Sequence, residues 1–558
     1  MCVFRCICLL LIVANCVRCE RENFTSNHTI NLGSTITIDA SKPPVDDITF
    51  YGEYSIKAFS INTISVHNFT DSKYGFGILQ VHSCWYNLTL SFNKTEIQPN
   101  FYENGTNLGF TLYPSRQKTQ DIYLHNYNYF TSVNISVALI MYNKTTPEPG
   151  GCNMEYSVAN APVLVVTYRK DFISIDTPLA AYRADETNEV KRCNVSLSYM
   201  GYHLFLKRGD YTCRSLFDGI KRLMTIGSAR DNGILGASVP GGVAHRRKYA
   251  AIPGTGIVFQ TIVSGKWGTS STYVPAFSIS CSPALWETSC NIFDTATYHV
   301  LAGILITVGV IRGYFSHVLR AVSVFIDGFI FGLLTVFYTI YLYDADISED
   351  KFEQFLIIGA LFIAILLTIL FMCFEVLHKS FTLISNIIVG YLLGAFIVYF
   401  IDDYFYDFKS YGWMYETVFV GSILAVMIVI TVCPSLGPLV LSATCGSFYI
   451  VQGLCYFYGN HLNYVVFNAL RYTSVVGFRE VHSTPAVNIE DLWFLLLWLV
   501  LGISAVFFQL ELQKQRHYSG DINERAPLIS RMTRGSDEVF ESPESNTRFL
   551  KQLHSRRH

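Results

Sequence analysis

Motifs for catalysis and for binding a metal or a nucleotide are absent from this 558-residue chain. It has no Gly-x-Ser-x-Gly nucleophile elbow, no Walker loop, no His-Glu-x-x-His pair and no acidic metal-binding loop. The sequence therefore offers no residue for catalysis, for a cofactor or for a metal ion, and we predict a non-enzymatic protein without a cofactor. The net charge of −2 gives no indication of a nucleic-acid partner, and we predict none.

Glycosylation sequons are absent after residue 194, although residues 23–194 contain nine of them. An asparagine in an Asn-x-Ser/Thr sequon receives a glycan only where the secretory machinery reaches it. From about residue 295 onward the chain is a series of apolar segments separated by short polar turns. We therefore predict a luminal or extracellular N-terminal half and a membrane-embedded C-terminal half. The predicted glycosylation sites are Asn23, Asn27, Asn68, Asn87, Asn93, Asn104, Asn134, Asn143 and Asn194.

The start of the chain carries one basic residue, Arg5, before the apolar run 6–14. This run is too short to span a bilayer, which needs about 20 residues. Residues 1–19 are therefore predicted to be a signal peptide that is removed. The composition, 51% hydrophobic and 15% charged with a mean hydropathy of +0.30, is typical of a membrane protein that carries a large soluble part.

Cysteines fall into three groups: five in the signal segment, six between residues 84 and 290, and four in the predicted membrane helices. Six cysteines in an oxidising compartment indicate disulfides, and free thiols are the alternative. The sequence does not choose among the pairings, but our best single prediction is a Cys281–Cys290 bridge just before the membrane. Their spacing does not resemble a zinc site. The disulfide candidates are Cys84, Cys152, Cys193, Cys213, Cys281 and Cys290.

An alternating apolar pattern in the ectodomain predicts β-strands. In residues 87–93, around Asn134 and beside Asn194, apolar side chains fall on one strand face and sequon asparagines on the other. Strands of this kind favour a sandwich with outward glycans. We predict two β-rich units, residues 20–168 and 169–294.

The second unit contains two further local patterns. Leu216, Ile220 and Leu223 recur at helical spacing and predict a short packing helix. The basic residues 245–248 predict a solvated turn.

Apolar runs in the C-terminal half predict a seven-helix membrane domain over residues 295–510. Seven spans after a removed signal peptide place the C-terminus in the cytosol, and Arg312, Arg320 and Lys379 in the first two inside loops agree. Because the turn between the fifth and sixth spans is uncharged, the sequence leaves open whether these two spans are counted correctly. Residues 511–558, polar and rich in Lys and Arg, are predicted to be a disordered cytosolic tail. The spans are 295–311, 321–343, 355–376, 381–401, 417–433, 438–458 and 492–510.

Glycine pairs four residues apart mark two of these helices. Gly328 and Gly332 share one face of the second helix, and Gly390 and Gly394 share one face of the fourth. Such faces allow helix backbones to approach closely. Both helices are the second member of a possible hairpin, so a repeated hairpin is one hypothesis.

Few polar residues lie deep in the predicted spans, and the candidates are His299, Asp327, Glu375 and Asn386. An isolated carboxylate inside a membrane is costly and raises the hypothesis of a transport role. Asp327 lies about two turns inside its helix, where it can snorkel or pair with Arg320. We therefore favour a structural role for it.

The tail contains Glu524, Leu528 and Ile529 in the spacing acidic-x-x-x-Leu-Ile. This motif resembles the acidic dileucine signal that clathrin adaptors bind, because it offers one acid and two apolar side chains from a flexible segment. It predicts adaptor binding and residence in the endolysosomal system or at the plasma membrane.

Segments spread along the chain carry a family resemblance: Pro149 to Glu155, Pro253 to Val258, Tyr273 to Ala276, Asn468 to Arg471, and 524–529. Their order and the overall layout resemble the transmembrane 7 superfamily member 3 family. The resemblance implies a multi-pass membrane protein without known catalytic activity that is associated with cell survival and protein homeostasis under stress. The seven-helix part is similar to the transmembrane protein 198 domain. Residues 1–130 contribute least to this family resemblance. We expect Cys84 and Cys213 to be particular to this chain.

Three functions are compatible with these patterns. We favour a non-enzymatic membrane protein whose ectodomain binds an unknown luminal or extracellular protein. A G-protein-coupled heptahelical receptor is disfavoured, because the third helix lacks an Asp-Arg-Tyr-like triplet and the seventh lacks Asn-Pro-x-x-Tyr. A channel or transporter would need Asp327, His299 and Asn386 to converge on one cavity.

Overall fold

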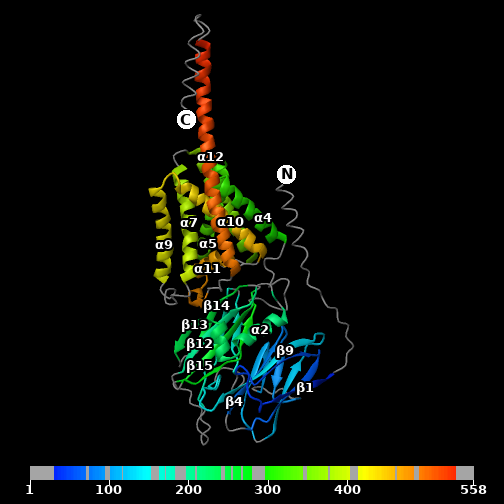
Figure 1. The fold of residues 1–558 in the computed structure, drawn as a ribbon. Coiled ribbons are helices and arrows are strands. Elements are labelled where there is room, and N and C mark those ends of the chain that lie inside the picture. Colours follow the sequence, from blue (N-terminus) through cyan, green and yellow to red (C-terminus); the bar gives the residue numbers. More distant parts are fainter. Residues whose placement is uncertain are drawn as a thin grey trace, which may run out of the picture.

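The computed structural model shows two β-sandwich units and a helix bundle stacked on the second of them (Figure 1). This confirms the predicted fold class, a membrane protein with a β-rich ectodomain and a helical domain. The signal segment, Asn23, Asn27, Cys193, Asn194, Cys281 and Cys290 lie outside the described residues. The structure describes residues 31–535 apart from 71–73, 95–100, 116, 153–161, 170, 183–196, 208–209, 211, 241–244, 253–254, 266–267, 280–295, 343–348, 375–377, 402–411, 459–461 and 483–488.

The first unit is a sandwich of two sheets, ordered β1-β3-β8-β5-β6 and β2-β9-β4-β7. Aliphatic side chains from the facing sides, such as Ile64, Leu79 and Leu124, are fully buried between them. Removing this apolar surface from water is the main favourable term for the unit. The strands are β1 (Asn31–Asp39), β2 (Phe50–Ile56), β3 (Ser60–His67), β4 (Tyr74–Ser83), β5 (Leu88–Ser91), β6 (Tyr102–Gly105), β7 (Asn107–Leu112), β8 (Thr119–Asn126) and β9 (Val133–Asn143).

The predicted alternation holds in one strand and is wrong in another. At the start of β9, Val133 and Ile135 are buried while Asn134 is exposed. In β5 every residue is buried, and the strand lies between β8 and β6 inside the five-stranded sheet. The strand ends at Ser91, so Phe92 does not continue a buried face; it is exposed and stacks on Phe110.

The second unit is also a sandwich, with sheets β10-β11-β14-β18 and β13-β12-β15-β16, and β17 pairs with β15. The strand Val165–Tyr168 pairs with β11, so it belongs to this unit. The predicted boundary at residue 168 is therefore too late in the chain. The apolar spacing after Ser215 does form a helix, which begins at Cys213 with Thr212 as its N-cap. The elements are β10 (Val165–Tyr168), β11 (Phe172–Thr177), β12 (Ser198–Phe205), α2 (Cys213–Leu223), α3 (Ile226–Asn232), β13 (Ile234–Pro240), β14 (His245–Ala250), β15 (Ile257–Ser264), β16 (Ser270–Thr272) and β17 (Ala276–Ser278).

The two units share an apolar core. Ala138 and Ile140 on the outer face of β9 pack in one cluster with Leu216 and Phe217 of α2. A disulfide between Cys84, after β4, and Cys213, at the start of α2, joins the units covalently. Cys152 is also disulfide-bonded. The ectodomain is thus one packed body.

The basic residues 245–248 are not a solvated turn, as predicted, but part of β14. Strand alternation explains the error, because it sends neighbouring cations to opposite faces. Arg246 is exposed and pairs with Asp176, whereas Arg247 is buried and donates from Nη2 to the Tyr199 carbonyl at 2.9 Å. A Cβ at Gly201 would lie 2.7 Å from Arg247 Nε, so glycine makes room for this guanidinium.

The described residues of the C-terminal half contain six helices long and apolar enough to cross a membrane, together with the shorter apolar segment His299–Tyr314. They correspond to the seven predicted spans. The turn between the fifth and sixth spans separates two helices, α9 and α10. The bounds are α4 (Ala296–Tyr314), α5 (Arg320–Leu342), α6 (Glu349–Cys373), α7 (His378–Ile401), α9 (Gly412–Val432), α10 (Gly437–Tyr458), α11 (Asn463–Ser474) and α12 (Ile489–Gly535).

The bundle helices pack as the pairs α4 with α10, α5 with α6, and α7 with α9. Gly328 and Gly332 lie against Ala364 and Ala360 of α6, and Gly390 and Gly394 lie against Ile423 and Phe419 of α9. The glycine-bearing helices therefore pack on the helix that follows them, so the hypothesis of hairpins that end in these helices is wrong. In the third pair a Cβ at Gly446 would lie 2.2 Å from the Gly313 nitrogen, so only glycine allows that approach.

A segment from the bundle completes a sheet of the ectodomain. The loop after α11 contains a short 3₁₀ helix, η5 (Phe478–Glu480), and the strand β18 (Val481–His482), which pairs in parallel with Lys248 and Tyr249 of β14. Lys248 Nζ lies 2.7 Å from a Glu480 carboxylate oxygen, and Arg471 Nη1 donates to the Ala251 carbonyl at 2.9 Å. We call these contacts the β18 clamp, and they fix the second unit on the bundle.

The helix α12 extends through much of the predicted disordered tail. It runs to Gly535 and leaves the bundle at the end remote from the ectodomain (Figure 1). The prediction of disorder is thus wrong for residues 511–535, since the polar sequence after the span continues the helix of the span itself. The spacing of Glu524, Leu528 and Ile529 lies within this helical stretch, and residues 536–558 lie outside the described part of the chain.

Candidate functional site: a polar cavity at the remote end of the bundle

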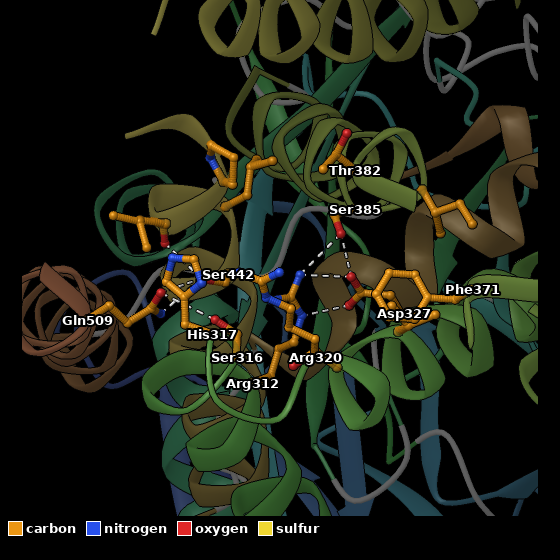
Figure 2. A pocket seen from close by; sticks show the side chains of 16 residues that line it. Arg312, Ser316, His317, Arg320, Asp327, Phe371, Thr382, Ser385, Ser442 and Gln509 are labelled. Carbon is orange, nitrogen blue, oxygen red and sulfur yellow. Dashed lines mark hydrogen bonds and ion pairs between the residues drawn. The ribbon is translucent and has the colours of Figure 1, made fainter. Parts of the chain in front are cut away.

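A polar cavity of about 230 Å³ lies between α4, α5, α6, α7, α10 and α12, at the end of the bundle remote from the ectodomain. Helices bring it together because α4 ends there, α5, α7 and α10 begin there, and α12 passes by. Figure 2 shows the polar side chains of these helices turned toward one another. The lining residues are Arg312, Ser316, His317, Arg320, Ser323, Val324, Asp327, Phe371, Thr382, Ile384, Ser385, Pro438, Leu439, Leu441, Ser442 and Gln509.

A buried ion pair forms one wall of the cavity (Figure 2). Arg312 of α4 donates from Nε to Asp327 Oδ1 at 2.8 Å and from Nη2 to Oδ2 at 2.7 Å. Both side chains are nearly fully buried, with 6% and 7% of their surface exposed. Ser385 of α7 completes the group, because its hydroxyl donates to Asp327 and accepts from Arg312. This bidentate arrangement neutralises the two charges and ties three helices together.

The predicted pairing of Asp327 with Arg320 is therefore wrong. The sequence predicted that Arg312 lies in a loop, because the apolar run ends at residue 311. Helix α4 instead continues to Tyr314 and directs Arg312 inward. Arg312 lies within one helical turn of the apolar run, and this position was the sequence signal that the helix could include it.

A second polar group forms the opposite wall and was also missed. Gln509 of α12 is fully buried and exchanges hydrogen bonds with Ser442 of α10, while its amide nitrogen donates to the Gly313 carbonyl. Ser316 donates to the Gln509 side-chain oxygen at 3.2 Å. A lone glutamine in the last span was the signal, because an amide buried among apolar helices needs partners.

The other polar residues predicted at depth do not join this cavity. His299 is exposed at the opposite end of α4, where its ring contacts Tyr456 and Phe457. Asn386 is buried but does not line the cavity, and Glu375 lies outside the described residues. The convergence of Asp327, His299 and Asn386 that a transport role required is absent from the described structure.

The described part of the chain assembles no metal centre. No group of three or more His, Cys, Asp or Glu residues there could hold a metal ion. Among the described cysteines that form no disulfide, Cys373 and Cys433 are exposed, and Cys445 and Cys455 are buried.

The described sequon asparagines lie at the surface of the first unit. Asn68, Asn87, Asn104, Asn134 and Asn143 are exposed, and Asn93 is half-buried. Glycosylation of these residues remains a prediction.

The fold defines the class of the protein, a multi-pass membrane protein with a two-sandwich ectodomain. Three family models match consecutive parts of it: a TM7SF3-like N-terminal immunoglobulin-like domain over 45–142, a second immunoglobulin-like domain over 147–284, and a TM7S3/TM198-like domain over 302–510. The chain belongs to the transmembrane 7 superfamily member 3 family, as its sequence predicted.

Relatives from mammals agree with this assignment. The mouse transmembrane 7 superfamily member 3 is 24% identical over 491 residues, which cover 83% of this chain and 84% of the relative. The human protein of the same name is 23% identical over 468 residues, which cover 79% of each. The family is not a known enzyme family. A solved β-1,2-glucanase from Parabacteroides distasonis aligns at 11% identity over 41% of this chain and 30% of its own, with a TM-score of 0.13, which carries no argument.

Proposed function

We propose that this is a non-enzymatic membrane protein whose ectodomain binds a protein partner on the luminal or extracellular side. The observation that carries the proposal is a cluster of aromatic side chains on the first immunoglobulin-like unit, formed by Phe59, Tyr127, Tyr129 and Phe130. The last three are 48%, 61% and 74% exposed. Large aromatic rings left in water favour association, and tyrosine and tryptophan are enriched among residues that dominate binding energy.

The aromatic cluster is held in a fixed arrangement. The Phe59 ring stacks on Tyr129 at 4.6 Å, and the Phe59 backbone N–H donates to the Asn128 carbonyl at 3.0 Å. Phe59 has a φ of 45°, a left-handed conformation that strains a bulky residue. Strain of this kind concentrates at functional sites, where neighbouring contacts hold it. A rigid cluster loses little conformational entropy on binding, which supports a recognition role.

The β18 clamp supports a role that involves the whole chain. Because β18 extends the β14 sheet, the ectodomain contacts the ends of the bundle helices directly and is not connected to them by a linker alone. The cluster Phe172, Tyr415, Tyr472, Phe478 and Val481 buries apolar side chains from both halves. A partner that binds the ectodomain would thus act on the bundle through these direct contacts. By family resemblance, we connect this role to cell survival and protein homeostasis under stress.

Site-specific photo-crosslinking of the full-length chain in cells tests the partner. We expect a benzoylphenylalanine at position 130 to give a discrete crosslinked species, since this side chain would face the partner. The matched control carries benzoylphenylalanine at position 45 instead. Val45 is about as exposed as Phe130 and lies in the same unit, but outside the cluster. Crosslinking that is absent at position 130, or equal at both positions, would contradict the proposal.

We further propose that the ectodomain is luminal or extracellular, and that the C-terminus is cytosolic and carries a sorting signal. The exposed sequons and the exit of α12 at the remote end of the bundle (Figure 1) support this orientation. The helical setting of residues 524–529 means that adaptor binding would have to unwind this stretch. Leu528→Ala/Ile529→Ala is expected to move the steady-state distribution toward the plasma membrane. An unchanged distribution, imaged beside Lys514→Gln as the control, would discard the sorting signal.

A further inference from the structure

The cavity at the remote end of the bundle has an excess of positive charge. Arg312, His317 and Arg320 line it, and Asp327 is the one acidic residue among its lining side chains. Both carboxylate oxygens of Asp327 are taken by Arg312 and Ser385. Arg320 is exposed at the cavity wall (Figure 2) and forms no ion pair within the part of the chain that the structure describes. Its positive charge is therefore not balanced locally.

Helix ends add to this charge. The helices α5, α7 and α10 all begin at the cavity, and none of the three has an acidic residue in its first turn. Each helix N-terminus carries about half a positive charge. Helix α10 contributes through this dipole rather than through its N–H groups, because the Gly437 N–H donates to the Cys433 carbonyl and residue 438 is proline. Arg320 itself begins α5, where a cation is unfavourable unless an anion offsets both charges. These helix ends and the guanidinium of Arg320 therefore favour a negative ligand.

A buried hydroxyl points to the same ligand. Ser323, in the first turn of α5, lines the cavity with 7% of its surface exposed, and its Oγ has no hydrogen-bond partner in the described structure. Leaving a buried hydroxyl unsatisfied is unfavourable, so an acceptor in the cavity would remove that cost. This observation is independent of the charges, and it asks for a hydrogen-bond acceptor at the same place.

We propose that this cavity binds a phosphate-type anion, presented either by a lipid headgroup of the adjacent leaflet or as free phosphate. Tetrahedral phosphate oxygens accept from a guanidinium, a hydroxyl and helix N–H groups at once. The volume of about 230 Å³ suits a headgroup or a small ion, because sites for drug-sized ligands occupy about 300–1,000 Å³. The candidate membrane span of α5 begins at Arg320, and with this span in a bilayer the cavity would lie at headgroup depth.

Thermal unfolding of the full-length chain in nanodiscs tests this site. One arm adds inorganic phosphate to phosphatidylcholine discs, with chloride at equal ionic strength as the reference, and the other arm uses discs that contain phosphatidic acid without free phosphate. We expect a concentration-dependent rise in the unfolding midpoint in at least one arm, because a ligand bound to the native state stabilises it. A rise with free phosphate alone identifies a soluble anion, and a rise restricted to phosphatidic acid identifies a lipid headgroup.

Two variants connect the response to the cavity. Arg320→Gln is expected to weaken apparent anion affinity about ten- to a hundredfold, the usual effect of losing a charged hydrogen bond, and Ser323→Ala a few-fold to about tenfold. Both should fold, because neither side chain has a hydrogen-bond or ion-pair partner among the described residues. Lys514→Gln is the matched control, because Lys514 is an exposed cation on α12 that does not line the cavity. No midpoint shift in either arm, or equal shifts in all three variants, would overturn the proposal.

Discussion

Replacing Arg312 with methionine is expected to lower the free energy of unfolding by about 3–5 kcal/mol, because it leaves the Asp327 carboxylate buried without its countercharge. Ser385 would remain as its neutral partner, and one hydroxyl cannot replace a bidentate guanidinium. The loss should appear as a lower midpoint in denaturant titrations of the purified chain in mixed micelles. Lys514→Gln is the control for removing an exposed cation outside the cavity.

The double variant Arg312→Met/Asp327→Leu separates the pair from the packing around it. Apolar side chains of similar size often replace a buried ion pair without loss of stability, since no charge then has to be desolvated. We expect it to recover most of the stability that the single variant loses. A double variant as unstable as Arg312→Met alone would show that the side-chain shapes or Ser385, and not the unpaired charge, determine the effect.

The sequence was most informative where one physical property dominates. Apolar runs near the length that a bilayer requires predicted the bundle helices within a few residues. The Gly446 position, in contrast, shows why helix partners could not be predicted. Its close approach to Gly313 joins the sixth span to the first, which are distant in sequence.

The functional features depended on register and on long-range pairing. Arg312 meets Asp327 only because α4 extends one turn past its apolar run and both side chains turn to the same gap. The strand β18 has two residues and no pattern of its own, so it exists only because β14 offers it an edge. The charges of β14 suggested a turn, since the pocket that accepts Arg247 is formed by Gly201 and Tyr199 of another strand.

Acidification is expected to destabilise the ectodomain next to the β18 clamp through His203. This side chain is buried in β12, its Nδ1 has no hydrogen-bond partner in the described structure, and its ring lies 5.1 Å from that of Tyr249. Phe205 flanks it on the same strand, Phe259 pairs opposite in β15, and His482 of β18 lies 5.4 Å beyond Tyr249. None of these neighbours carries a negative charge that could stabilise a protonated ring.

Burial, together with repulsion from His482, lowers the pKa of His203 from its ordinary 6.5 to about 3. Below pH 6.5 the unfolded chain binds a proton at this residue, while the native chain does not until about pH 3. Stability is therefore complete above pH 6.5 and is lost as the pH falls, at up to about 1.4 kcal/mol per pH unit, or about 2.7 kcal/mol by pH 4.5. Denaturant titrations of the full-length chain between pH 7.5 and 4.5 measure this loss.

The His203→Phe variant isolates this residue, because the buried His82, whose pKa burial lowers to about 4, contributes a similar slope to the whole chain. We expect the variant to lose about 2–3 kcal/mol less than the wild type on acidification to pH 4.5. His67→Gln, at a half-buried histidine of β3, is the control for replacing another histidine of the ectodomain. An unchanged slope in His203→Phe would mean that the native chain takes up the proton at His203 with little cost. If the slope does fall, protonation of His203 would weaken the packing of β12 against Tyr249 of β14, in the sheet that β18 completes.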